Sequence, residues 1–149
     1  MNVDLERAIV RYYTTRLAAD TTLTGKTYTI LASMGDDPIP EKTPVITVKV
    51  TETPSKMATL VDAQVDTLVA VPMDIDADAT ATVALYENAV RRAWDEITHP
   101  TATEDLNTLV EDECEDYLGG GFDAQGWVKD QDGNMALPTY RVHVGLVRG

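Results

Sequence analysis

The stretch that decides the fold runs from Leu60 to Ile97 and reads LVDAQVDTLVAVPMDIDADATATVALYENAVRRAWDEI. Up to Pro72, every second residue is valine, alanine or threonine, and these alternate with a second set that contains most of the polar residues: Leu60, Asp62, Gln64, Asp66, Leu68 and Ala70. This is the period of a long half-buried strand. Beyond an aspartate-rich turn, apolar residues follow the spacing of an amphipathic helix: Val83, Tyr86, Val90, Ala93, Trp94 and Ile97. Because the buried face of so long a strand needs a cover, we expect this helix to pack on it.

The chain before this stretch contains one helix and two shorter strands. Leu5 to Leu17 has apolar residues on one helical face. Tyr28 to Ala32 and Val45 to Thr51 have the composition of strands, and glycine and proline separate them. A turn at Pro54 leads from the second of these strands into the long one, so we expect an antiparallel hairpin.

In the chain after Ile97 we expect a further helix, which is acidic, and another hairpin. The helix is expected over Glu104 to Leu118, with Gly119 to Gly121 as its C-cap and a flexible joint. Gly126 to Lys129 and Tyr140 to Val147 flank a turn rich in aspartate and glycine, which is typical of a hairpin. The sequence therefore predicts a single α+β domain over residues 1–149, with one mostly antiparallel sheet packed by two or three helices.

The charge of the chain limits its partners. Its 25 acidic and 12 basic residues give a net charge of −13. A protein that holds nucleic acid needs clustered lysine and arginine to displace counterions, so DNA is not expected as a bound ligand. The excess of aspartate, with abundant threonine, fits a surface adapted to solubility or to salt. The same surface would also suit contact with a basic partner or repulsion of passing DNA.

Length and residue types exclude further classes. A chain of 149 residues can bury roughly 70% of its unfolded surface without staples. The single cysteine, Cys114, excludes an intramolecular disulfide and a multi-cysteine metal site. The chain opens MNVDLERAIVRYY without an apolar leader, and its apolar runs are far shorter than a membrane span. We therefore expect a soluble protein that no classical signal exports.

Two motifs resemble ligand sites and fail on their spacing. Gly25-Lys26-Thr27 resembles the end of a phosphate-binding loop, but Asp20 stands where the first glycine belongs and a strand follows. Asp74, Asp76 and Asp78 begin like a calcium loop, but Ala79 replaces its glycine. We interpret Asp78 as a helix cap, and Asp130 to Asn134, which raises the same question, as a hairpin turn.

Nucleophilic chemistry has little support in the sequence. Ser33 and Ser55 lie outside any nucleophile elbow, and carboxylates surround Cys114, which disfavours its thiolate. His99 and His143 each stand alone in sequence. We therefore expect no catalytic residue, no metal site and no cofactor.

The order of elements resembles the tail terminator family of tailed bacteriophages and related viruses. The resemblance spans nearly the whole chain and rests on these segments: the helix Leu5 to Leu17, the strand in Thr43 to Val48, the long strand with its acidic turn Met73 to Asp78, the helix from Thr80, and the final strand with Tyr140 to Val144. The acidic helix Glu104 to Leu118 and the triple glycine depart from the family, which expects a shorter connection there.

The resemblance implies a structural protein of the virion, assembled in the host cytoplasm and without enzymatic activity. Such a protein forms a ring, commonly a hexamer, that caps the tail tube and joins it to the head, with the tail tube protein and a head-completion protein as partners and DNA as passing cargo. We expect its assembly surface to include Asp36, Asp37, Ile39, Tyr13, Glu111 and Glu115. Tyr13 is included because Tyr12 and Tyr13 are adjacent on a helix, so only one of them is expected to face fully inward.

Three other functions stay open. The departure at the acidic helix and the triple glycine leaves related neck proteins, such as head-completion or stopper proteins, as alternatives. The carboxylates between Glu104 and Asp116 also suit an acidic binding module that mimics DNA. A hydrolase with scattered Asp, Glu and His has no support from spacing, although the abundance of carboxylates keeps it open.

Overall fold

The computed structural model describes residues 3–33, 42–54, 60–72, 79–95, 97–114, 117–129 and 138–148. In chain order the elements are α1 (Val3–Ala18), the 3₁₀ helix η1 (Thr21–Leu23), β1 (Thr29–Ala32), β2 (Val45–Pro54), β3 (Leu60–Ala70), α2 (Ala79–Ala93), α3 (Ala102–Glu113), β4 (Tyr117–Lys129) and β5 (Pro138–Arg148). None of the described helices is long and apolar enough to span a membrane.

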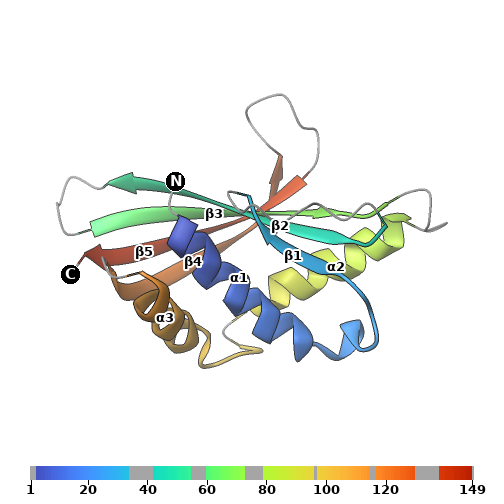
Figure 1. The fold of residues 1–149 in the computed structure, drawn as a ribbon, viewed down its shortest axis with the longest axis horizontal. Helices are drawn as coiled ribbons and strands as arrows, with labels where there is room; N and C mark the ends of the chain where they lie inside the picture. Colours follow the sequence, from blue (N-terminus) through green and yellow to red (C-terminus); the bar gives the residue numbers. More distant parts are fainter. Residues whose placement is uncertain are drawn as a thin grey trace.

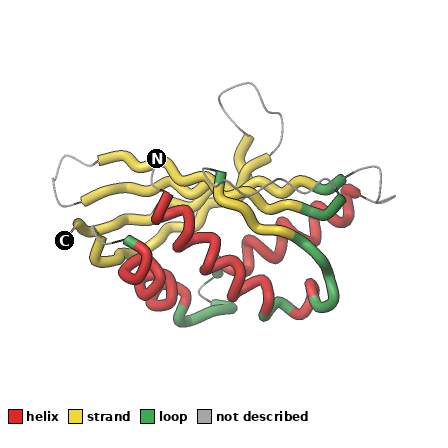
Figure 2. Tube along the Cα trace, viewed as in Figure 1, coloured by secondary structure: helices red, strands yellow, loops and turns green. Residues whose placement is uncertain are grey.

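The strands form one mixed sheet in the order β1-β2-β3-β5-β4. Only β1 and β2 are parallel, and the other three pairs are antiparallel. The three described α-helices lie together on one face of this sheet, and no described helix covers its other face (Figures 1 and 2). The expected α+β class and mostly antiparallel sheet are confirmed.

The long strand lies at the centre of the sheet, as its sequence predicts. It pairs with β2 from Val45 opposite Ala70 to Pro54 opposite Val61, and this pairing confirms the expected hairpin. Its alternate residues Val61, Ala63, Val65, Thr67 and Val69 are buried toward the helices. Because the side chains of every second residue are buried on one face, the register of such a strand is fixed. A slip by one residue would turn all of these side chains to the other face.

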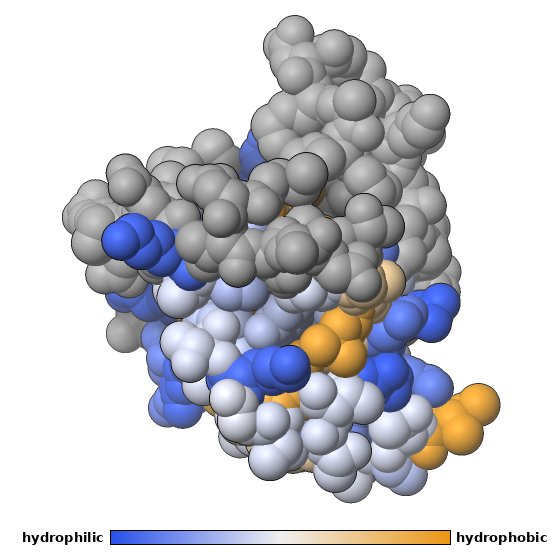
Figure 3. Space-filling model, turned by 90° about the vertical axis from the view of Figure 1, so that its right-hand side faces the viewer, coloured by the Kyte–Doolittle hydropathy of each residue, from blue (hydrophilic) through white to orange (hydrophobic). Residues whose placement is uncertain are grey.

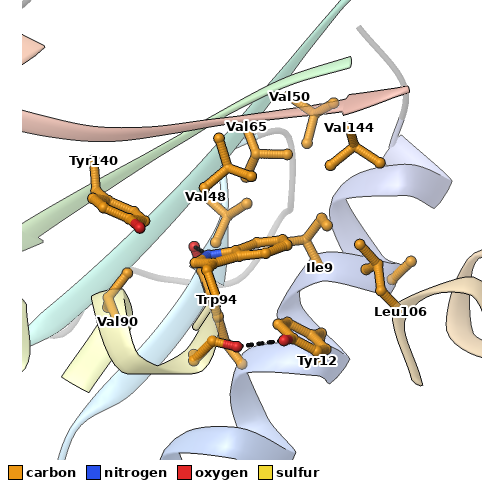
Figure 4. Close-up of a cluster of buried hydrophobic side chains, with 14 of the residues drawn as sticks. Ile9, Tyr12, Val48, Val50, Val65, Val90, Trp94, Leu106, Tyr140 and Val144 are labelled. Atoms are coloured by element: carbon orange, nitrogen blue, oxygen red, sulfur yellow. Dashed lines mark hydrogen bonds between the residues drawn. The ribbon is translucent and has the colours of Figure 1, made fainter. Parts of the chain in front are cut away.

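The core lies between this buried face and the helices (Figure 4). Trp94, just beyond the end of α2, is 1% exposed and packs its ring against Tyr12 at a centroid distance of 4.9 Å and against Tyr13 at 5.8 Å. Val48, Val50 and Val65 of the sheet close the cluster from above. The helix after the long strand therefore covers it, as expected.

The acidic helix α3 ends earlier than the expected range of Glu104 to Leu118. It ends at Glu113, and Cys114 leaves it with an extended backbone at φ −122° and ψ 109°. The prediction that Gly119 to Gly121 cap this helix is wrong, because they lie within β4, where Gly120 and Gly121 pair with Leu146 and Gly145 of β5. Pairing with a long neighbouring strand overrides the local preference of glycine for a helix end.

The apolar stripe of α2 also ends earlier than predicted. Ile97 is 92% exposed, although the helical spacing places it on the buried side. The helix stops at Ala93, and Ile97 belongs to a turn in which its N–H donates to Asp95 Oδ1. The period of 3.6 residues has no meaning beyond the last helical turn.

Candidate functional site

The residues predicted to form an assembly surface fall in different places. Glu111 is exposed on α3, which agrees with a surface role without testing it. Asp36, Asp37, Ile39 and Glu115 lie outside the described residues. Tyr13 is fully buried, so it is no part of the surface of this chain.

The prediction that only one of Tyr12 and Tyr13 faces inward is wrong, because both are buried. The Tyr12 hydroxyl donates to the Ala93 carbonyl. The Tyr13 hydroxyl accepts from Trp94 Nε1 at 2.8 Å and lies 2.6 Å from Thr67 Oγ1, to which it can then donate. Helix α1 contacts the sheet on one side and α2 and α3 on others, so adjacent side chains can both be enclosed. Burial raises the pKa of Tyr13, so this hydroxyl stays neutral and structural.

The sheet face opposite the described helices carries a polar network. Asp66 accepts from Arg141 Nε at 2.8 Å and from Gln64 Nε2 at 2.9 Å. Along the same strands, His143 Nδ1 lies 3.0 Å from Asp62 Oδ2. We call the residues of this face the open sheet face: Thr47, Lys49, Thr51, Thr53, Asp62, Gln64, Asp66, Arg141 and His143. Its two carboxylates are balanced by one lysine and one arginine, in a chain whose net charge is −13.

A buried carboxylate that the sequence did not reveal lies under the sheet. Glu6 of α1 is 0% exposed, and its Oε2 accepts from Ser33 Oγ at 3.0 Å and from the Val50 N–H at 3.1 Å. These bonds join α1 to β2 and to the residue after β1. Spacing on the helix gave no signal for this contact, because both donors come from other parts of the chain.

The acidic face of α3 is partly neutralised by α1. Arg11 Nη1 lies 2.6 Å from Asp112 Oδ2 and 2.7 Å from Glu113 Oε1. These hydrogen bonds raise the pKa of Arg11, and the bond to Asp112 contributes most. Arg16 pairs in the same way with Asp105. A DNA mimic needs carboxylates free to meet a basic groove, so these pairs weaken that alternative.

Helix η1 is tied to α2 by a part-buried ion pair. Asp20 caps η1 through the Thr22 N–H and accepts from Arg92 Nε at 2.9 Å. Burial acts to raise the pKa of Asp20, but the hydrogen bonds from Arg92 and Thr22 outweigh it and lower that pKa. Asp20 therefore has a structural role here and no resemblance to a phosphate-loop residue.

His99 gives the fold a weak dependence on pH. Burial, followed by the Arg16 guanidinium 3.4 Å from Nδ1, lowers the pKa of His99 below 6.5. Between that lowered value and 6.5, the unfolded chain binds a proton that the folded chain does not, so stability falls as the pH drops through this window. We expect urea unfolding between pH 7.5 and pH 5 to show this loss in the wild type and a smaller loss in His99→Gln. Equal losses in the two proteins would contradict this role for His99.

The other motifs form no catalytic arrangement within the described residues. Lys26 follows Gly25, which has a left-handed φ of 76°, and leads into strand β1 rather than a helix. Cys114 is 3% exposed in the core. Across the described ranges no group of three or more His, Cys, Asp or Glu side chains is placed to hold a metal. The aspartates at 74, 76 and 78 and the turn at 130–134 lie outside those ranges.

A groove runs between α1 and the outer strand β1. It has a volume of about 520 Å³ and is lined by Thr14, Ala18, Lys26, Thr27, Tyr28, Thr29 and Ile30. Lys26 in this groove forms no ion pair with any residue that the structure describes. Figure 3, seen from the right of Figure 1, shows that hydrophilic and neutral colours cover most of the described surface on that side, with orange confined to small areas. A partner for this side would therefore need polar contacts more than apolar ones.

Comparison with known proteins adds no assignment: neither the protein-family models nor the curated proteins contain a match to this chain.

Proposed function

We propose that this chain is a structural protein of a viral neck, a tail terminator that forms a ring on the end of the tail tube and joins it to the head. The observation that carries the proposal is the one-sided architecture. Three helices cover one face of the sheet, and among the described residues no helix covers the opposite face and no further strand pairs with the outer strands β1 and β4. Open sheet edges are sites where strands of other subunits add.

The open sheet face supports contact with protein rather than conversion of a substrate. Both carboxylate oxygens of Asp66 already accept hydrogen bonds, one from Arg141 Nε and one from Gln64 Nε2. Such a network gives a preformed polar surface, and its balanced charge lets another acidic molecule approach it. The order of helices and strands that motivated the resemblance is also the order in the fold.

A head-completion or stopper protein is the closest alternative, because the same architecture would serve it. The two differ in the partner that they bind. A terminator binds the end of the tail tube, and a stopper binds the connector of the filled head.

Binding assays with isolated tails and heads test this function. We expect the purified chain to form rings visible by electron microscopy and to bind the ends of tail tubes assembled without it. Binding to the head connector alone would favour the stopper. A chain that binds neither component and forms no ring would contradict both.

A further inference from the structure

The outer edge of β1 presents backbone groups that no described strand pairs. The Thr29 N–H donates to the Pro44 carbonyl at 3.0 Å and the Ser33 N–H donates to the Val48 carbonyl at 2.8 Å, both toward β2. Peptide groups of alternate residues in a strand point to opposite sides, so those of Ile30 and Ala32 point away from β2. Strand β1 is the first in the sheet order, and within the described ranges no strand lies beyond it.

The groove beside this edge has room for an added strand. Ile30 lines it on the β1 side, and Thr14 and Ala18 of α1 line the opposite wall. A strand added to a sheet lies about 4.8 Å from its neighbour and needs space for the side chains that point toward the helix layer. The groove supplies that space on the helix side of the sheet.

The other open edge is β4, at the far end of the sheet order. Its ladder with β5 is irregular between Tyr117 and Gly120 and again between Ala124 and Trp127. The regular run from Gly120 to Ala124 is thus close in length to the four residues of β1. Three consecutive glycines, Gly119 to Gly121, adjoin this run, and glycine in a strand allows close approach of another backbone.

Both edges are nearly free of the acidity that dominates the chain. Residues 25–33 contain Lys26 and no carboxylate. Strand β4 contains one carboxylate, Asp123, and one lysine, Lys129, which balance. The side chains of the two strands therefore repel each other little, and the nearest acidic element is helix α3, which packs on β4 and is partly neutralised by Arg11 and Arg16.

We propose that the β4 edge of one copy, along Gly120 to Ala124, pairs with the β1 edge of the next copy and so extends the sheet between subunits. In the sheet, β4 runs opposite to β5 and β2 runs parallel to β1, so β4 and β1 point in opposite directions. Copies related by rotation about an axis along the strands would pair these edges antiparallel. The contact joins different surfaces of the two copies, and such head-to-tail contacts give a ring when the rotation between neighbouring copies closes. This inference rests on the proposed function and specifies the contact within the ring.

Two substitutions at Ile30 test the backbone contact. Ile30→Pro removes the N–H that points away from β2, whereas Ile30→Ala shortens the same side chain and keeps that N–H. We expect Ile30→Pro to weaken self-association by about tenfold or more relative to Ile30→Ala. Circular dichroism and thermal unfolding check that both variants fold. Equal association of two folded variants would overturn the inference.

A charge-reversal pair tests the same contact without touching the backbone. Lys26→Glu places a carboxylate in the groove, and Lys49→Glu makes the same change on β2, on the open sheet face and outside the groove. We expect Lys26→Glu to weaken association and Lys49→Glu to have a smaller effect. Equal weakening by both would show that overall charge, rather than this edge, controls association, and it would overturn the inference.

Cysteine cross-linking identifies which edges meet. Thr29→Cys is mixed with single cysteine variants at positions 120 to 124, and the native Cys114 is buried and does not interfere. We expect disulfide-linked dimers with alternate positions of the β4 run and not with Thr29→Cys alone. Cross-linking of Thr29→Cys to itself, or to none of the five positions, would overturn the edge pairing. If wild-type rings persist in that case, the inference fails and the proposed function stands, whereas a wild type that forms no ring and binds no tail fails both.

Discussion

Replacing Trp94 by alanine is expected to lower the free energy of unfolding by about 3–5 kcal/mol. The ring is 1% exposed and contacts Tyr12 and Tyr13 at the junction of α1 and α2. Its loss opens a cavity below the long strand and removes the N–H that donates a hydrogen bond to the Tyr13 hydroxyl. Urea unfolding followed by circular dichroism measures the change.

Ile97→Ala is the matched control, because the sequence places Ile97 on the same helical stripe as Trp94 while the structure leaves it 92% exposed. We expect a change within about 0.5 kcal/mol for this substitution. Large losses for both variants would contradict the end of α2 at Ala93 and favour the longer helix that the periodicity predicts.

The second large effect is expected at Glu6. Glu6→Ala removes the acceptor for the buried Val50 N–H of β2 and for the part-buried Ser33 hydroxyl. A buried donor left without a partner costs about 1–3 kcal/mol, so we expect the free energy of unfolding to fall by at least that amount. The unfolding midpoint in urea measures the loss.

Glu104→Ala on α3 controls for the removal of one negative charge, because Glu104 is exposed. We expect this variant to stay within about 0.5 kcal/mol of the wild type. If Glu6→Ala were as stable as Glu104→Ala, the bonds from Glu6 to the sheet would have no net value for the fold.

The centre of the fold was predictable because its signals are periodic and long. The strand from Leu60 alternates over its whole length, and the turns beside it are marked by Pro54 and Pro72. Periodicity over many residues leaves one consistent assignment, since each position supports its neighbours. Tyr140, Val142 and Val144 alternate with Arg141, His143 and Gly145 in the same way, and the structure buries the first three.

Element ends and paired partners were not predictable in the same way. Gly119 to Gly121 have the local signature of a helix cap, and only pairing with β5 places them in a strand. Ile97 continues the helical spacing, but the chain turns at Asp95, so the spacing no longer predicts which way Ile97 faces. Tyr13 is enclosed because several elements surround α1. The sequence of the helix alone does not indicate how many elements pack around it.

In the candidate site, too, the facing of residues was predictable and their bonding partners were not. The alternation of β3 and β5 predicted which residues face outward, but not that Asp66 would bond to Arg141 and Gln64. Glu6 carried no signal, because its donors are 27 and 44 residues away along the chain. The roles of Asp36, Asp37, Ile39 and Glu115 on an assembly surface stay predictions, since these residues lie outside the described ranges.

The mass of the purified wild-type chain in solution, measured over a range of concentrations, tests most directly whether this protein works by joining copies of itself. The account predicts a closed oligomer of defined size, which dissociates to the 16.3 kDa monomer only on dilution. A monomer at every concentration, with tail tubes present as well as absent, would contradict it.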